Sequence, residues 1–376
     1  MRIAYLINGL NGGGAAFPMT QVIGLMRELG HEVTVFALMQ QDGKAAQRLK
    51  RDNIPYELIG QGVYDFVAPA VRLVRRLRRM QPDLLWTSLT RGTIYGQLMG
   101  HLLDIPVVSW QHSAFLKPGN VAMLRRLARF TSLWVADSEA VSAFAQTTLG
   151  LDAKRVRVWT PFVATAQVAA CNHWDGRGPL RLGSLGRLHV SKQFSVLVRA
   201  FARMRELDPR LAANVELYVG GDGPEEADLK ALVRRLDLEH SVRFVGFVQQ
   251  PATFLSSLHG YVQTSLKEGF CIAAHEAMQA GLPVIATRVG ELAYSVKPAD
   301  TGWLCDVGDV EALARAMIEL ASDPTAAASM GRQAREWVLR RYSPERFRGT
   351  GERLLDEVQC ALGVAREEAP STSFMR

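Results

Sequence analysis

The chain has 376 residues, a length that suggests about two domains, and its 48% hydrophobic and 22% charged residues are typical of a soluble globular protein. No apolar run reaches the ~18–20 residues of a membrane-spanning helix, and the first residues are expected to form a strand rather than a signal peptide. The net charge of +7 fits a phosphate-bearing ligand or an anionic membrane, and no aromatic-interleaved motif points to nucleic acid.

Short β-branched runs alternate with helical periodicity in both halves of the chain, which predicts two doubly wound α/β units with parallel sheets. In the first half, strands are predicted at 3–7, 32–36, 56–59, 84–87, 107–110, 133–136 and 156–159. After a linker-like stretch at 165–178, strands are predicted at 180–185, 215–219, 242–245, 261–264, 283–286 and 302–304. Two such units facing each other are expected to hold a ligand between the carboxyl ends of their strands.

The glycine cluster at 12–14 follows the first predicted strand and precedes a helix, where backbone amides can approach an oxyanion. Phe17 stands where a G-x-G-x-x-G motif has its third glycine, so a dinucleotide site is disfavoured. A tight turn without a ligand is the alternative.

Two arginine-rich segments, 67–80 and 121–130, have the period of amphipathic helices. The apolar face is predicted to comprise Val67, Ala70, Val71, Val74 and Leu77 in the first segment and Val121, Leu124 and Leu127 in the second. Basic amphipathic helices suit an anionic membrane surface, and an ordinary solvated helix face is the alternative.

Two cations follow the first strand of the second half. That strand ends at Gly186, and Arg187 and Lys192 lie in the loop before the next helix. An arginine fork and a lysine point charge at the mouth of a sheet suit a diphosphate. Solvated surface cations are the alternative.

Glu268 and Glu276 stand eight positions apart in the stretch LKEGFCIAAHEAMQAGLPVIAT at 266–287. A strand leads into this stretch, and a helix is expected to begin near Cys271 and Ile272, so that the first amides point outward without partners. Carboxylates that accept from hydroxyls and amides that donate to phosphate are what a sugar nucleotide requires. The alternative is a helix cap followed by a buried helical carboxylate.

The motifs occur in a characteristic order. GRLHVSK, GGDGP, VGFV and EGFCIAAHEA are followed by AGLPVIAT, TGWLCDVGDVEALARAM and RRYSPERF. This ordered set resembles the retaining glycosyltransferases of family four, which have the GT-B fold, over nearly the whole chain. The resemblance implies an acceptor-binding Rossmann-like domain at 1–165 and a donor-binding one at 179–342. It also implies a helix at 343–361 that packs back on the first domain, before a flexible tail at 362–376.

The resemblance also implies roles for individual residues. Glu268 is expected to contact the donor sugar, Glu276 to hold the ribose hydroxyls, and Arg187 and Lys192 to bind the diphosphate as its charge develops. His112 is expected to hydrogen-bond the donor sugar and orient the acceptor, with a purely structural histidine as the alternative. The remaining residues expected to line the donor, largely through their backbones, are Gly13, Gly14, Gly186, Val245, Phe247, Phe270, Cys271 and Ile272.

Two positions depart from the family pattern. Gln193 replaces the glycine that usually follows Lys192, and Cys271 stands where a small residue is usual. Neither change removes a backbone donor, so both bear on the geometry of the donor site rather than on the class of protein.

The implied activity is transfer of a hexosyl or N-acetylhexosaminyl group from a UDP- or GDP-sugar to a lipid-linked or saccharide acceptor, in cell-surface polysaccharide or glycolipid biosynthesis. No D-x-D motif occurs, so we expect transfer without a metal or other cofactor, and no side chain is an obvious covalent nucleophile. The resemblance implies that the anomeric configuration is retained by front-face attack. Unpaired cysteines and the membrane-facing helices predict a cytoplasmic protein at the inner face of the membrane. The alternatives are a non-hydrolysing nucleotide-sugar epimerase and a non-catalytic nucleotide-sugar-binding protein.

Overall fold

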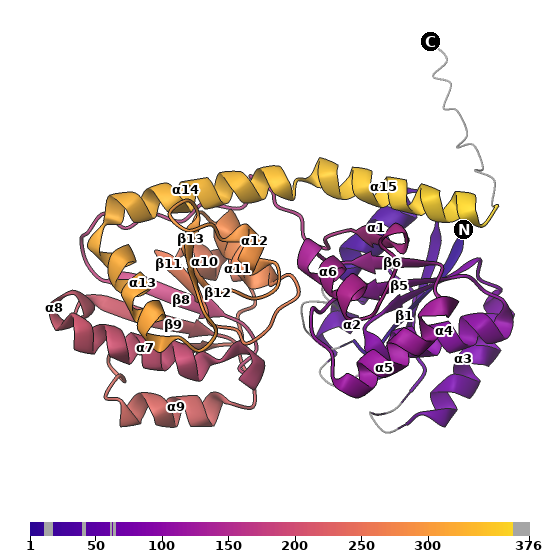
Figure 1. Cartoon of the computed structure of the whole chain (residues 1–376), viewed down its shortest axis with the longest axis horizontal. Coiled ribbons are helices and arrows are strands. Elements are labelled where there is room, and N and C mark those ends of the chain that lie inside the picture. Colours follow the sequence, from indigo (N-terminus) through magenta and orange to yellow (C-terminus); the bar gives the residue numbers. More distant parts are fainter. Residues whose placement is uncertain (11–17, 40–42, 61, 63–64, 364–376) are drawn as a thin grey trace, which may run out of the picture.

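Two separate parallel β-sheets, one from each half of the chain, form the framework of the protein (Figure 1). The computed structural model describes residues 1–10, 18–39, 43–60, 62 and 65–363. In both sheets a strand is followed by a segment that returns the chain to the starting edge, which is what parallel pairing demands.

The described part of the first domain contains a seven-stranded sheet in the order β3-β2-β1-β4-β5-β6-β7. Its strands are β1 (Arg2–Ile7), β2 (Glu32–Ala37), β3 (Tyr56–Leu58), β4 (Leu84–Ser88), β5 (Val107–Gln111), β6 (Leu133–Ala136) and β7 (Val156–Val158). The connecting helices are α1 (Met19–Glu28), α2 (Lys44–Arg51), α3 (Val67–Met80), α4 (Thr90–Leu103), α5 (Pro118–Leu127) and α6 (Glu139–Thr147), with short 3-10 turns η1 (Ala128–Phe130) and η2 (Ala153–Arg155).

The second domain has a six-stranded sheet in the order β10-β9-β8-β11-β12-β13. Its strands are β8 (Leu180–Leu185), β9 (Val215–Gly220), β10 (Val242–Gly246), β11 (Gly260–Gln263), β12 (Val284–Thr287) and β13 (Gly302–Cys305). Its helices are η3 (Val190–Lys192), α7 (Phe194–Leu207), α8 (Pro209–Ala212), α9 (Glu226–Arg235), α10 (Pro251–Ser256), α11 (Ile272–Gln279), α12 (Leu292–Ser295), α13 (Val310–Ser322) and α14 (Pro324–Arg341).

The predicted alternation of strands and helices is confirmed. Each predicted strand is present, and its ends fall within one residue of the prediction. The periodicity is informative because the interior strands β4, β5 and β6 are buried along their whole length, as parallel strands covered on both faces must be. In each sheet the strand order reverses beside the first strand, between β1 and β4 and between β8 and β11. Ligands of open α/β sheets bind at such switch points.

The final helix, α15 (Pro344–Ala361), leaves the second domain and lies along the first (Figure 1). Leu354, Leu355 and Val358 are buried in the core of the first domain. The close approach depends on Gly351, because a Cβ there would lie 2.5 Å from Trp159 and 2.6 Å from Leu25. The indole Nε1 of Trp159 also donates to the Phe347 carbonyl at 3.1 Å. The predicted return of the last helix to the first domain is therefore confirmed.

The apolar side chains of α3 lie on more than one face of the helix. Pro69, Leu73 and Leu77 are its buried residues, whereas Val67 and Val71 are 76% and 45% exposed. Of the predicted apolar face, Leu77 therefore meets the core, and the two valines remain at the surface. In α5, Leu124 is buried with Val121 packed beside it, and Leu127 is half-buried. Among the described residues, no helix combines the length and apolar character needed to traverse a lipid bilayer.

The helix α15 provides a test of how the first domain is stabilised. Gly351→Ala is expected to lower the free energy of unfolding by about 1–3 kcal/mol, because the added methyl group overpacks the contact with Trp159. Gly349→Ala in the same helix is the matched control. A Cβ there meets only the end of the Arg353 side chain at 3.7 Å, so a gain of about 0.5–1 kcal/mol is expected. Chemical denaturation measures both, and equal effects would contradict the close contact.

Candidate functional site

A lysine and a glutamate from neighbouring strands form an ion pair at the carboxyl edge of the second sheet. Lys192 ends η3, in the connection after β8, and Glu268 follows β11, which pairs with β8. The Lys192 Nζ atom lies 2.5 Å from Glu268 Oε1, and the Ser265 hydroxyl donates to the same oxygen at 2.6 Å. Their side chains are 25% and 10% exposed, so the pair is partly shielded from water.

Hydrogen bonds between the two loops hold this pair in place. The Thr264 hydroxyl donates to the carbonyls of Lys192 and Gln193 at 3.1 and 3.0 Å, and the Leu266 amide donates to the Ser191 carbonyl at 2.9 Å. Burial lowers the pKa of Lys192, but the charge and hydrogen bond of Glu268, together with a contribution from Cys271, outweigh burial, so that the pKa lies above its ordinary value. The lysine is therefore an ammonium at neutral pH, with N–H groups left for an anionic ligand.

The helix α11 begins directly beside the pair. Cys271 is its N-cap, and burial, together with the Glu268 carboxylate, raises the pKa of the Cys271 thiol well above its ordinary range. The Phe270 side chain is buried, stacks on His275 at 3.9 Å and meets Tyr342 edge-on at 5.1 Å. Phe270 can therefore meet a ligand only through its backbone, and Cys271 stays a neutral thiol.

Both departures from the family pattern have the same structural explanation. Gln193 has φ 50° and Cys271 has φ 67°, which places both in the left-handed region where glycine carries no penalty. In addition, Gln193 Oε1 is buried without a hydrogen-bond partner among the described residues. The chain therefore holds two residues other than glycine in a conformation that glycine adopts freely, at a local cost in conformational energy.

Glu276 lies about one turn into α11. Burial raises its pKa to about 7, and the charge of Arg48, on α2 of the first domain, partly opposes this shift. A carboxyl group with such a pKa changes its ionisation near neutral pH. Because Arg48 belongs to the first domain, its interaction with Glu276 also shows that the first domain faces this part of the second domain.

The other predicted site residues of the second domain form no ion pair or hydrogen bond with Lys192 or Glu268 that the described residues show. Gly186 lies next to the Lys192 side chain, because a Cβ there would be 3.8 Å from the lysine Cε. Arg187 is exposed and forms no ion pair within the described residues. Val245 and Phe247, at the end of β10, are also exposed.

A lysine of the first domain contacts the region of Phe247. Lys44, at the start of α2, lies 3.7 Å from the centre of the Phe247 ring and 3.4 Å from the Asp222 carboxylate. Sequence analysis missed Lys44 because nothing in its own segment indicates a partner in the other domain. Gly13 and Gly14, predicted to approach the ligand from the first domain, lie outside the described residues.

His112 brings the first domain against the Glu268 loop. Its backbone carbonyl lies so close to Gly269 that a Cβ on this glycine would be 2.1 Å away. The imidazole Nε2 is 2.5 Å from the Ser88 hydroxyl, and Nδ1 is 3.0 Å from the Asp137 carboxylate. Sequence analysis missed Ser88 and Asp137. Both stand at the carboxyl ends of predicted strands, where ligands of parallel sheets bind, so the argument that indicated His112 applies equally to them.

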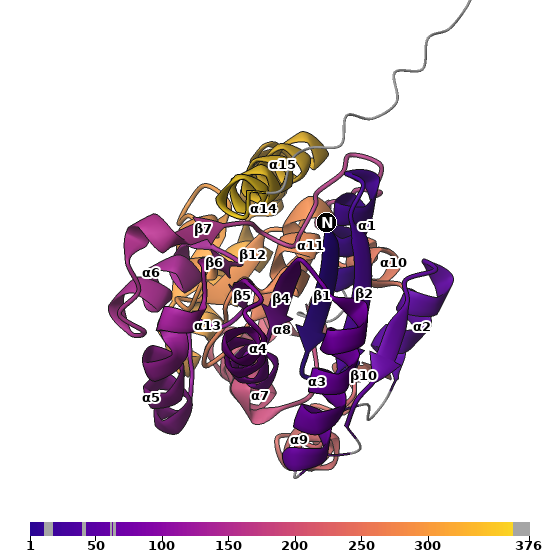
Figure 2. The same cartoon turned by 90° about the vertical axis from the view of Figure 1, so that its right-hand side faces the viewer.

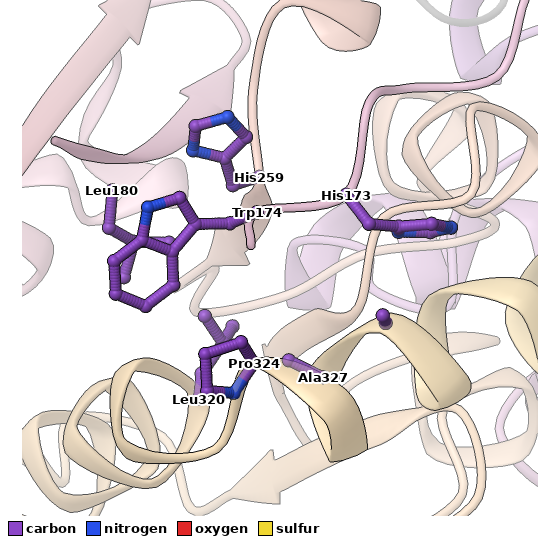
Figure 3. A pocket seen from close by; sticks show the side chains of 8 residues that line it. His173, Trp174, Leu180, His259, Leu320, Pro324 and Ala327 are labelled. Atoms are coloured by element: carbon purple, nitrogen blue, oxygen red, sulfur yellow. The ribbon is translucent and has the colours of Figure 1, made fainter. Parts of the chain in front are cut away.

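A small cavity in the second domain lies apart from these residues (Figure 3). Its volume of about 10 Å³ is roughly that needed for one water molecule. In Figure 3 the Trp174 indole lies between His259 and Pro324. Burial, followed by the charge of Arg181, lowers the pKa of His259 to about 4, so the imidazole is neutral. The cavity is too small for a nucleotide.

Comparisons with known proteins agree with this arrangement. The family model described as "Glycosyltransferase Family 4" matches residues 12–167, and "Glycosyl transferases group 1" matches residues 177–337. The chain is 34% identical to N-acetyl-alpha-D-glucosaminyl L-malate synthase of Bacillus anthracis over 43% of this chain and 42% of that protein. It is 27% identical to the lipopolysaccharide core biosynthesis glycosyltransferase LpsE of Rhizobium meliloti over 51% and 55%. The chain thus spans about half the length of these two relatives.

Longer matches extend across both domains. The lipopolysaccharide core biosynthesis glycosyltransferase LpsD of Rhizobium meliloti is 24% identical over 91% of this chain and 94% of that protein. The crystal structure of Anabaena HepE in complex with UDP-glucose superimposes with a TM-score of 0.83 over 95% of this chain and all of that chain, at 22% identity, which shows a shared fold. With two parallel sheets and family models that match both halves, the chain belongs to the group 1 glycosyltransferases of family four, with the GT-B fold.

Proposed function

We propose that this protein is a retaining glycosyltransferase that uses a nucleotide diphosphate sugar as its donor. The observation that carries the proposal is the Lys192–Glu268 pair, at the start of α11 and opposite the His112 carbonyl of the first domain. A cation, a carboxylate and a helix start thereby lie together where the two domains meet, a combination that would suit a nucleotide diphosphate sugar. The names of the relatives, which include two lipopolysaccharide core transferases, support the same class of reaction.

The diphosphate is assigned to Lys192, Arg187 and the first amides of α11. The Lys192 ammonium uses one N–H for Glu268 and can direct the others to phosphate oxygens. Arg187 is exposed and lies five residues away, so its guanidinium can fold over the same anion. The amides of Cys271 and Ile272, at a helix start, add partial positive charge. These groups stabilise the negative charge that develops on the leaving diphosphate.

The carboxylates are assigned to the hydroxyl groups of the donor. Ser265 and Lys192 both donate to Oε1 of Glu268, which allows its second oxygen to accept from a sugar hydroxyl. Glu276, about one turn into α11, is assigned to the ribose. The exposed Val245–Phe247 segment is assigned to the base. HepE is described in complex with UDP-glucose, which favours a UDP-sugar as the first donor to test.

The proposed transfer proceeds on one face of the sugar. The bond from the anomeric carbon to the diphosphate oxygen breaks, the acceptor oxygen forms its bond on the same face, and the leaving phosphate takes the acceptor proton. The side chains near the pair provide no better nucleophile, because the buried Cys271 thiol remains protonated. We propose that Lys192, Arg187 and the helix start supply the charge stabilisation, so that no metal is required.

The acceptor is proposed to be a saccharide or a lipid-linked saccharide reached from a membrane surface. Exposed apolar side chains lie on three neighbouring helices, with Val67 and Val71 on α3, Leu102 on α4 and Met123 on α5. Exposed arginines accompany them on α3 and α5. Apolar groups beside cations are the combination that binds an anionic lipid surface. We therefore propose that the protein acts at the cytoplasmic face of the membrane.

The first test combines donor binding with turnover. UDP-, GDP- and ADP-sugars are compared by thermal shift, because a bound donor raises apparent stability. Transfer and donor hydrolysis are then measured for the wild type and for Arg187→Met, a change that breaks no ion pair of the described chain. Loss of a charge-assisted contact to the leaving group is expected to lower kcat/KM about 10²-fold. Lys192→Met is expected to lower it at least as much.

Arg199→Met is the matched control, because Arg199 is an exposed arginine of α7 and lies outside the proposed site. Its kcat/KM is expected to equal that of the wild type. Full activity in both Arg187→Met and Lys192→Met would overturn the proposal. Conversion of the donor into an epimer would identify an isomerase, and donor binding without transfer or hydrolysis would identify a binding protein.

Glu276 gives the free protein a pH dependence. A carboxyl pKa raised from 4.5 to about 7 means that the folded chain retains a proton that the unfolded chain has lost between these values. Stability from this group is therefore complete below about pH 4.5 and declines as the pH rises to about 7. Urea unfolding at pH 5, 6, 7 and 8 is expected to show a larger decline in the wild type than in Glu276→Gln. Identical curves would contradict the raised pKa.

Membrane binding is tested by co-sedimentation with vesicles that contain or lack anionic lipid. Anionic vesicles are expected to retain the wild-type protein at low salt and to release it as salt screens the arginines. Replacing both Val67 and Val71 by serine is expected to weaken retention, whereas Val307→Ser in the second domain leaves it unchanged. Binding that is independent of anionic lipid would contradict the proposed surface.

A further inference from the structure

Three polar side chains of the first domain form a continuous row of hydrogen bonds. Ser88 Oγ lies 2.5 Å from His112 Nε2, and His112 Nδ1 lies 3.0 Å from both carboxylate oxygens of Asp137. The side chains of His112 and Asp137 are only 7% and 6% exposed, and Ser88 is fully buried. Such a row is costly unless each member is satisfied by the next, so its members depend on one another.

The row follows from the strand order. Strands β4, β5 and β6 are adjacent and parallel, with Ser88 opposite Trp110 and Gln111 opposite Ala136. Ser88 is the last residue of β4, while His112 and Asp137 each come one residue after β5 and β6. The carboxyl ends of three neighbouring strands thus bring these three side chains to the same edge of the sheet. The His112 ring also lies against Trp110, with 5.2 Å between the ring centres, which limits its rotation.

The chemistry of the row determines where the His112 proton lies. A carboxylate can only accept hydrogen bonds, so the Nδ1 atom that faces Asp137 must carry a proton. In a neutral imidazole the other nitrogen, Nε2, is then an acceptor, and the Ser88 hydroxyl donates to it. The assignment follows from the identity of the two partners.

Ser88 is not positioned to act as a nucleophile, although a serine, a histidine and an aspartate are linked in the order of a hydrolase triad. Its side chain is fully buried at the end of a central strand, so a substrate carbonyl or anomeric carbon cannot reach Oγ. Its hydroxyl can rotate, however, and can exchange one acceptor for another. Ser88 is therefore a replaceable partner of Nε2, whereas Asp137 is a fixed partner of Nδ1.

We propose that Asp137 is a positioning residue that keeps the proton of His112 on Nδ1, so that Nε2 can accept a hydrogen bond from a substrate hydroxyl. In the free protein Ser88 occupies this acceptor, and the substrate hydroxyl replaces Ser88 on binding. The proposal rests on the proposed function, since it requires a hydroxylated substrate beside His112. It also assigns a specificity, because a sugar analogue that lacks this hydroxyl leaves Nε2 with Ser88 and gains nothing from His112.

The tautomer is measured without any substrate. Long-range ¹H–¹⁵N spectra of the full chain, with the His112 signals identified by their absence in His112→Gln, report which ring nitrogen carries the proton. The wild type is expected to show protonated Nδ1 and unprotonated Nε2. Asp137→Asn offers an amide N–H to Nδ1 and is expected to move the proton to Nε2. A wild-type spectrum with protonated Nε2 would overturn the proposal, whatever the activity of the protein.

The kinetic consequence is measured by a double-mutant cycle. Asp137→Asn alone is expected to lower kcat/KM about 100-fold, as expected for loss of the correct tautomer. In the His112→Gln background the same change is expected to cost little more, because Asp137 acts through the imidazole. A loss that persists in full in that background would show that Asp137 serves only the fold. The unfolding curves of Asp137→Asn and the wild type are measured alongside. If they are equal, the loss of activity is due to the changed tautomer and not to lower stability.

Ser88→Ala distinguishes the replaceable partner from a reacting group. Activity is expected to be kept or to rise about twofold to threefold, because Nε2 no longer has an internal donor to lose; these figures correspond to less than about 1 kcal/mol. Abolished activity would overturn the assignment of Ser88. If the wild type neither binds nor consumes any sugar nucleotide, the proposed function fails, while the spectra still decide the role of Asp137.

Discussion

The contact between the Lys192 ammonium and the Glu268 carboxylate is the interaction on which the rest of the site depends. Two partly buried charges on loops from neighbouring strands are tolerable only together, because removal of either leaves the other without compensation. Hydrogen bonds from Thr264 and Ser265 hold both loops to this arrangement. The pair stands directly before Cys271, the N-cap of α11, and beside Gly269, where the first domain approaches through His112.

Glycine governs how closely the elements of this site approach one another. Gly269 lies against the His112 carbonyl, and Gly221 lies against the Gly186 carbonyl, where a Cβ would be 1.9 Å away. A side chain at either position would separate elements that the proposed donor site brings together. In contrast, Gln193 and Cys271 occupy left-handed positions without being glycine, so the chain accepts conformational cost where no close contact forbids a side chain.

Much of the fold could be predicted from the sequence because parallel strands buried on both faces give continuous apolar runs. The predicted strands were correct for this reason, and the motif order predicted the return of the last helix. Which residues of α3 are buried could not be predicted, since Val67 and Val71 continue a helical stripe that the sheet does not cover. Periodicity describes a helix by itself, whereas burial depends on what lies beside it.

The site was predictable where its residues share one loop and less so where they meet across strands or domains. Glu268, Cys271 and Ile272 lie within five residues of one another in sequence. Their proximity in space could therefore be predicted from the sequence alone. The partners of His112 come from other strands, and Lys44 comes from the other domain. To locate such residues, one must know the order of the strands in the sheet and how the two domains face each other. Local sequence patterns contain neither kind of information. Gly13 and Gly14 remain predictions, outside the described residues.

The return of α15 to the first domain gives the two domains a common pivot. The chain passes between the domains twice, after β7 and again between α14 and α15. The two connecting segments, or crossings, are joined by a hydrogen bond in which the Ala164 amide donates to the Tyr342 carbonyl at 2.8 Å. In both views α14 and α15 lie at the top, whereas Figure 2 places β10 towards the bottom (Figures 1 and 2). A rigid rotation about the joined crossings separates distant contacts most. The contact of Lys44 with the end of β10 therefore opens well before that of Glu139 with Arg341, beside the axis.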